Sequence, residues 1–106
     1  MLRLLRLRNP PRDHFLSVGR NMVGRLPDND VVIASPYVSR RHCAILVFSN
    51  GGCGIQDLGS TDGVYVDGER IKHPVPLKDG DEVRVGGLQL VLLYSVDATV
   101  NTEPAE

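Results

Sequence analysis

Apolar and polar side chains alternate along most of this chain, and this period of two constrains the fold more than any other feature. Such alternation is what a β-strand with one buried face produces. It recurs at residues 5–8, 64–66, 83–85 and 88–92, and short apolar runs at 31–34 and 43–48 indicate strands that are buried more completely. The best helix candidate is residues 1–8, which lack an N-cap and suit an edge strand at least as well. We therefore expect no substantial helix.

Turn-forming residues separate these segments. They are Pro10-Pro11, Pro27-Asp28-Asn29, Asn50-Gly51-Gly52, Asp67-Gly68, Asp79-Gly80 and Gly86-Gly87. Asp67-Gly68 stands between residues 64–66 and 69–71, and this dipeptide is a strong signal for a tight β-hairpin. Many short strands with regular turns predict an all-β fold, and we favour a β-sandwich over a barrel.

Length and composition predict one soluble domain. The chain has 106 residues and a mass of 11.6 kDa, with 24% charged and 42% hydrophobic residues, which argues against disorder and coiled coils. No apolar run has the roughly 18 residues that a membrane helix needs, and the arginine-rich start does not resemble a signal peptide. Two cysteines are too few for a disulfide scaffold or a zinc site. We expect a cytoplasmic protein without a metal, a cofactor or a membrane partner.

The sequence also predicts where the domain ends. From Ser95 onward the chain is polar and loses its alternation. We expect a folded domain over residues 1–94 and a tail or linker over residues 95–106.

The net charge of −1 conceals an asymmetry. Residues 1–42 hold eight arginines against three aspartates, a balance of +5, whereas the remainder has four basic and ten acidic residues, a balance of −6. A basic half suggests a surface that faces an anion, although charge balance between neighbouring strands would look the same. The pI near 6.3 argues against general nucleic-acid binding.

Three polar clusters fall in predicted loops, where β-sandwiches usually carry their function. They are Gly24-Arg25 with Asp30 after it, Ser39-Arg40-Arg41-His42, and residues 57–63 (DLGSTDG). Guanidinium groups and hydroxyls donate hydrogen bonds to phosphate oxygens, and glycines let the backbone approach a ligand closely. Together these residue types are suited to a phosphorylated peptide.

These clusters, with the residues that follow the third one up to Gly68 and with Asp79-Gly80-Asp81, resemble the forkhead-associated (FHA) domain family. The resemblance covers residues 15–93. When Gly24-Arg25 and Asp30 are counted separately, five fragments occur in the family's order and spacing. It implies a β-sandwich of about eleven strands that binds phosphothreonine peptides. The implied partners are phosphorylated proteins, such as substrates of Ser/Thr kinases.

The resemblance also implies roles for single residues. Arg25 and Ser39 match the main phosphate ligands, Arg40 adds to phosphate binding, and Thr61 matches a residue that contacts the phosphothreonine. Gly24, Ser60 and Gly63 match positions that shape the loops, and His42 matches a histidine that braces them without touching the ligand. Asp57 is expected to hold its loop.

Asp62 departs from the family pattern, because the family usually has an asparagine that holds the peptide main chain at this position. An ionised carboxylate only accepts hydrogen bonds, and it repels a phosphate dianion by about 1–2 kcal/mol, roughly a tenfold loss of affinity.

Three functions are compatible with this sequence. The first is a phosphothreonine-peptide reader. The second is a scaffold with the same fold that binds partners without phosphate, which Asp62 favours. The third is an enzyme that uses Ser39, His42 and Asp57 as a triad, but the serine lacks the sequence context of a nucleophile. We expect a reader and no catalytic residues.

Overall fold

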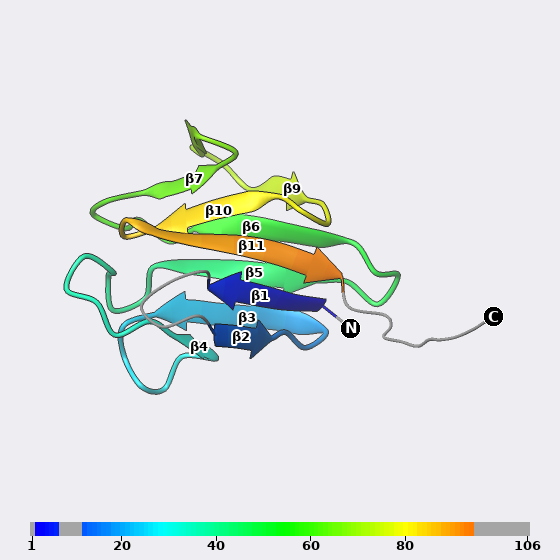
Figure 1. Ribbon diagram of the computed structural model, residues 1–106, viewed down its shortest axis with the longest axis horizontal. Helices are drawn as coiled ribbons and strands as arrows, with labels where there is room; N and C mark the ends of the chain where they lie inside the picture. The colour runs from blue at the N-terminus through cyan, green and yellow to red at the C-terminus, as the bar shows by residue number, and fades with distance from the viewer. Residues whose placement is uncertain (1, 7–11, 95–106) are drawn as a thin grey trace.

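The computed structural model describes residues 2–6 and 12–94, which form eleven strands and, within those ranges, no helix (Figure 1). This confirms the predicted all-β fold. No helix long and apolar enough to cross a membrane occurs in this part of the chain. The predicted tail at residues 95–106 lies outside the described residues, so the domain boundary at residue 94 stays a prediction.

The strands form two sheets. In order across the first sheet, they are β2 (Arg12–Phe15), β1 (Leu2–Arg6), β11 (Leu88–Tyr94), β10 (Glu82–Val85), β7 (Val64–Val66) and β8 (Glu69–Arg70). In order across the second sheet, they are β4 (Val31–Val32), β3 (Gly19–Gly24), β5 (Cys43–Val47), β6 (Cys53–Asp57) and β9 (Val75–Leu77). β3 and β4 pair in parallel, whereas the other pairs for which a register is defined are antiparallel.

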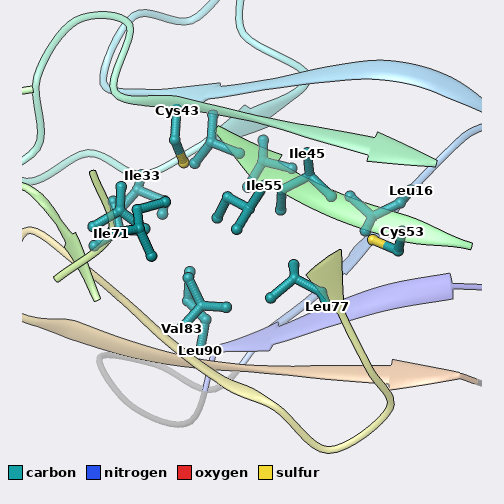
Figure 2. Close-up of a cluster of buried hydrophobic side chains, with 14 of the residues drawn as sticks. Leu16, Ile33, Cys43, Ile45, Cys53, Ile55, Ile71, Leu77, Val83 and Leu90 are labelled. Atoms are coloured by element: carbon teal, nitrogen blue, oxygen red, sulfur yellow. The ribbon is translucent and has the colours of Figure 1, made fainter. Parts of the chain in front are cut away.

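The two sheets enclose one apolar core, as expected of a sandwich. β7, β10 and β11 contribute residues from the first sheet, and β3, β5 and β6 contribute residues from the second. Figure 2 shows side chains from both sheets meeting in the interior, among them Ile45 and Ile55 on one side and Val83 and Leu90 on the other. These four side chains are fully buried.

The predicted alternation is present in β10. Val83 and Val85 are buried on either side of the exposed Arg84. The apolar run at residues 43–48 forms β5, where four of five side chains are buried, but Phe48 beyond its end is 54% exposed. The run at residues 31–34 forms only the two-residue strand β4, although Ile33 after it is also buried.

The expectation for the first residues needs a correction. Of the two alternatives, a helix and an edge strand, the chain forms a strand at Leu2–Arg6. However, β1 is not an edge strand, because it pairs with β11 on one side and β2 on the other. The pattern did not show that Arg12–Phe15 would fold back as β2 and take the edge position. Residues 7–8 of the predicted segment lie outside the described residues.

The Asp67-Gly68 hairpin is confirmed. Val66 and Glu69 are paired, which leaves a two-residue turn between β7 and β8. Both turn residues have positive φ angles, 49° for Asp67 and 88° for Gly68, as a type I′ turn requires. The Asp67 carboxylate also accepts a hydrogen bond of 2.9 Å from the backbone N–H of Glu82, which ties the turn to β10.

Candidate functional site

The three polar clusters of the sequence meet at one end of the sandwich, on the left in Figure 1. The loops that join β3 to β4, β4 to β5 and β6 to β7 border an open pocket of about 820 Å³ there. Its lining consists of Arg25, Leu26, Pro36, Tyr37, Val38, Ser39, Arg40, Arg41, Gly59, Thr61 and Asp62. All five predicted ligand-binding residues are thus in one pocket.

Gly24 and Arg25 are held against the second loop. A Cβ atom on Gly24 would lie 2.1 Å from the carbonyl oxygen of Arg40, so only glycine permits this approach. The backbone N–H of Arg25 donates to the carbonyl of Ser39 at 3.1 Å, and its side-chain Nε donates to the carbonyl of Val38, also at 3.1 Å. The second bond orients the guanidinium, and its two terminal amino groups bond no residue that the structure describes.

Ser39 connects the second loop to the third. Its Oγ accepts a hydrogen bond of 3.2 Å from the backbone N–H of Thr61, and its own hydroxyl donates to no acceptor in the described part of the chain. Its backbone N–H donates to Nδ1 of His42 at 3.0 Å. The serine is therefore held from two directions beside the exposed Thr61.

His42 lies under these loops and is fully buried. Because Nδ1 accepts from Ser39, the ring proton is on Nε2, which donates to the carbonyl oxygen of Gly63 at 2.8 Å. The backbone of His42 also bonds Val23 and Leu58. In the described residues this histidine joins the second and third loops and does not line the pocket.

The arginines at positions 40 and 41 have different surroundings. Arg41 forms an ion pair of 2.6 Å with Asp28 and donates to the side-chain oxygen of Asn29 at 3.1 Å. The Arg40 guanidinium has no hydrogen bond or ion pair to any residue that the structure describes, and it is exposed on the pocket wall. Arg40 is thus the cation of this pair that is available to an anion.

Asn29 is a supporting residue that the sequence analysis treated only as part of a turn. Its buried side-chain amide donates to the carbonyls of Leu26 and Arg40, at 2.8 and 2.9 Å. It thereby fastens the first loop to the second. The turn motif was the only signal in the sequence, and it does not indicate a contact 11 residues away.

The third loop is held by Asp57, whose carboxylate accepts a hydrogen bond of 2.9 Å from the backbone N–H of Ser60. The Ser60 hydroxyl is buried and has no hydrogen-bond partner among the described residues. Gly63 ends the loop with a φ angle of 82°, and a Cβ atom there would lie 2.5 Å from Nε of Arg70. These contacts leave Thr61 and Asp62 exposed on the pocket wall.

The hydrogen bonds also test the predicted alternative of a catalytic triad. A triad needs the histidine ring between the serine hydroxyl and the carboxylate. Here Nδ1 of His42 faces the Ser39 backbone, Nε2 faces Gly63, and Asp57 bonds Ser60. Ser39, His42 and Asp57 therefore do not form a triad. The described residues also hold no group of three or more His, Cys, Asp or Glu side chains that could bind a metal ion.

A family model for the FHA domain matches residues 16–86 of this chain. The transcriptional regulatory protein EmbR of Mycobacterium tuberculosis is 43% identical over 74 residues, which are 70% of this chain and 19% of EmbR. The chain thus spans about a fifth of the length of this relative.

Two solved structures resemble this fold closely. M. tuberculosis EmbR in complex with a low affinity phosphopeptide has a TM-score of 0.79 and 35% identity, and the match covers 87% of this chain and 24% of that one. A structure from an analysis of phosphothreonine-dependent FHA domain interactions has a TM-score of 0.83 and 28% identity, over 89% of this chain and 96% of that one.

Proposed function

This chain belongs to the FHA domain family, as its motifs predicted, and we propose that its loop pocket binds a phosphothreonine in a phosphorylated partner protein. The observation that carries this proposal is the arrangement of Arg25, Ser39 and Arg40. Donors from three residues line one open pocket, and no residue that the structure describes bonds the Arg40 guanidinium or the terminal amino groups of Arg25.

This arrangement suits a phosphate dianion. Guanidinium groups form charge-assisted hydrogen bonds with phosphate oxygens, and each such bond contributes about 1.5–3 kcal/mol. Three or four of them, reduced by the cost of ordering and desolvation, correspond to micromolar affinity, on the order of −7 to −8 kcal/mol. Because the loops are already fastened by Asn29 and His42, little ordering is left for the ligand to impose.

We also propose the setting of this binding. The domain acts as a recognition module that recruits substrates of Ser/Thr kinases in the cytoplasm, and it performs no reaction itself. Solved relatives support this, because the EmbR structure contains a phosphopeptide and another study describes phosphothreonine-dependent interactions of FHA domains.

Isothermal titration with a peptide pool, degenerate around one fixed phosphothreonine, tests this function. We expect micromolar binding by the wild type and a loss of at least tenfold in R25A, because one charge-assisted hydrogen bond is worth about that much. R84A is the matched control, since Arg84 is exposed on β10 and does not line the pocket. Equal affinity for the pool without phosphate, or undiminished binding by R25A, would refute the proposal.

One observation favours a second function, a scaffold that binds partners without phosphate. Asp62 places a negative charge on the wall of the pocket, where it opposes a dianion. If the domain is a scaffold of this kind, the wild type and the R25A variant would bind the partner with equal affinity.

A further inference from the structure

Within residues 2–6 and 12–94, Asp62 differs from the other aspartates in having no partner. The seven others in the described part of the chain each make a hydrogen bond, an ion pair or another electrostatic interaction: Asp13, Asp28, Asp30, Asp57, Asp67, Asp79 and Asp81. The Asp62 carboxylate makes none with any described residue, and its side chain is exposed on the pocket wall.

The absence of a partner matters because cations are near. Arg25, Arg40 and Arg41 line the same pocket, yet none lies within the 4.0 Å of Asp62 that an ion pair requires. Arg70 lies against Gly63, the residue after Asp62, and does not pair with it either. The pocket therefore has arginines on one part of its wall and an unpaired carboxylate on another.

A ligand that satisfies both parts must carry charges of both signs. A phosphate suits the arginines, but an ionised carboxylate can only accept hydrogen bonds, so a ligand that displaces water from it must supply a donor, preferably a cation. Thr61, which precedes Asp62, donates its backbone N–H to the hydroxyl oxygen of Ser39 at 3.2 Å. Asp62 therefore directly follows, in sequence, a residue that bonds the predicted phosphate ligand Ser39, and both Ser39 and Asp62 line the same pocket.

We propose that Asp62 is a specificity residue that selects phosphothreonine peptides with a lysine or arginine within two residues of the phosphothreonine. This inference rests on the function proposed above and names the ligand class. The basic side chain of the peptide pairs with Asp62 and so offsets the repulsion between this carboxylate and the phosphate. An asparagine at this position would hold the peptide main chain without regard to the neighbouring side chains.

A lysine scan tests this selection. Phosphothreonine peptides with one neutral background carry lysine, alanine or glutamate at each of the two positions on either side, and titration calorimetry gives their affinities. We expect at least one position where the wild type binds the lysine peptide about fivefold more tightly than the alanine peptide, and the glutamate peptide more weakly, as for an exposed ion pair. D62N should lose this preference and bind the lysine, alanine and glutamate peptides with affinities that no longer differ from one another.

E69Q is the matched control, because Glu69 is an exposed acid on β8 outside this pocket and its loss changes the net charge equally. It should keep the preference for lysine. Phosphopeptide binding with no preference for lysine at any position, or a preference that persists in D62N, would overturn this inference and leave the proposed function intact. If no phosphopeptide binds, both the inference and the proposed function are wrong.

Discussion

At the scale of single residues, the site depends on a buried side chain that does not line it. His42 bonds the backbone of Ser39 through one ring nitrogen and the carbonyl of Gly63 through the other, so it fixes the distance between two loops. No other protonation pattern of the ring fits, because Ser39 N–H can only donate and the carbonyl of Gly63 can only accept. The histidine is buried, so water cannot replace either bond.

H42A should therefore lower the free energy of unfolding by about 3 kcal/mol, from two lost hydrogen bonds and the cavity that remains. H73A removes an exposed imidazole and should change stability by less than about 0.5 kcal/mol. Urea denaturation measures both variants. Long-range proton–nitrogen NMR on the wild type should show the proton of His42 on Nε2, and a proton on Nδ1 would contradict the bracing role.

At the scale of elements, a turn in the first sheet supports the loop between β4 and β5 of the second sheet. The Gly86-Gly87 turn joins β10 to β11, and a Cβ atom on Gly86 would lie 2.6 Å from both the carbonyl oxygen of Tyr37 and Cγ2 of Val38. Tyr37 and Val38 immediately precede Ser39 on the pocket wall. The position of Ser39, the proposed phosphate ligand, thus depends on contact with a hairpin that is distant in the sequence.

The two glycines of this turn provide a matched pair of variants. Both have positive φ angles, 56° for Gly86 and 80° for Gly87, so alanine costs roughly 1–2 kcal/mol of backbone strain at either position. A Cβ atom on Gly87 meets nothing within 4 Å, whereas one on Gly86 displaces the loop. We expect G86A to weaken phosphopeptide binding at least fivefold more than G87A, measured by titration on folded protein. Equal affinities would show that the turn does not position the loop.

At the scale of the whole molecule, the sequence predicted local features better than distant contacts. Alternation predicted the strands around Arg84, and Asp67-Gly68 predicted the hairpin, because each depends on neighbours in the chain. The convergence of the three loops came only from the family resemblance. The contacts of Asn29 with Arg40 and of Gly86 with Tyr37 had no local signal, since they join segments that only the fold brings together.

The lack of a local signal for distant contacts also explains why β1 was expected at the edge of a sheet. The pattern of leucine and arginine at residues 1–8 was compatible with a strand, but it did not show how many neighbouring strands would pair with it, because pairing depends on distant segments. Its partners β2 and β11 lie at the two ends of the described chain. The pairing of Leu2 with Tyr94 joins residues that are separated by almost the whole described sequence.

The core gives the whole molecule a pH dependence of its own. Cys43 and Cys53 are buried between the sheets with free thiols (Figure 2). Burial raises the pKa of Cys53 from 9.0 to about 11, and burial together with the charge of Asp57 raises the pKa of Cys43 still further. Both thiols hold their protons more tightly in the folded protein than in the unfolded chain. Their contribution to stability is therefore complete below about pH 9. It is lost as the pH rises towards the pKa values of the thiols in the folded protein.

C53A isolates this contribution from other groups that titrate in alkali, because they are present in both proteins. For a pKa that rises from 9.0 to about 11, the wild type should lose about 1 kcal/mol more than C53A between pH 8 and pH 10. Urea denaturation at several pH values gives this difference, whatever the stability of C53A at neutral pH. If the two proteins lose stability in parallel, the Cys53 thiol ionises as readily in the folded protein as in the unfolded chain. The two sheets would then not exclude water from this thiol.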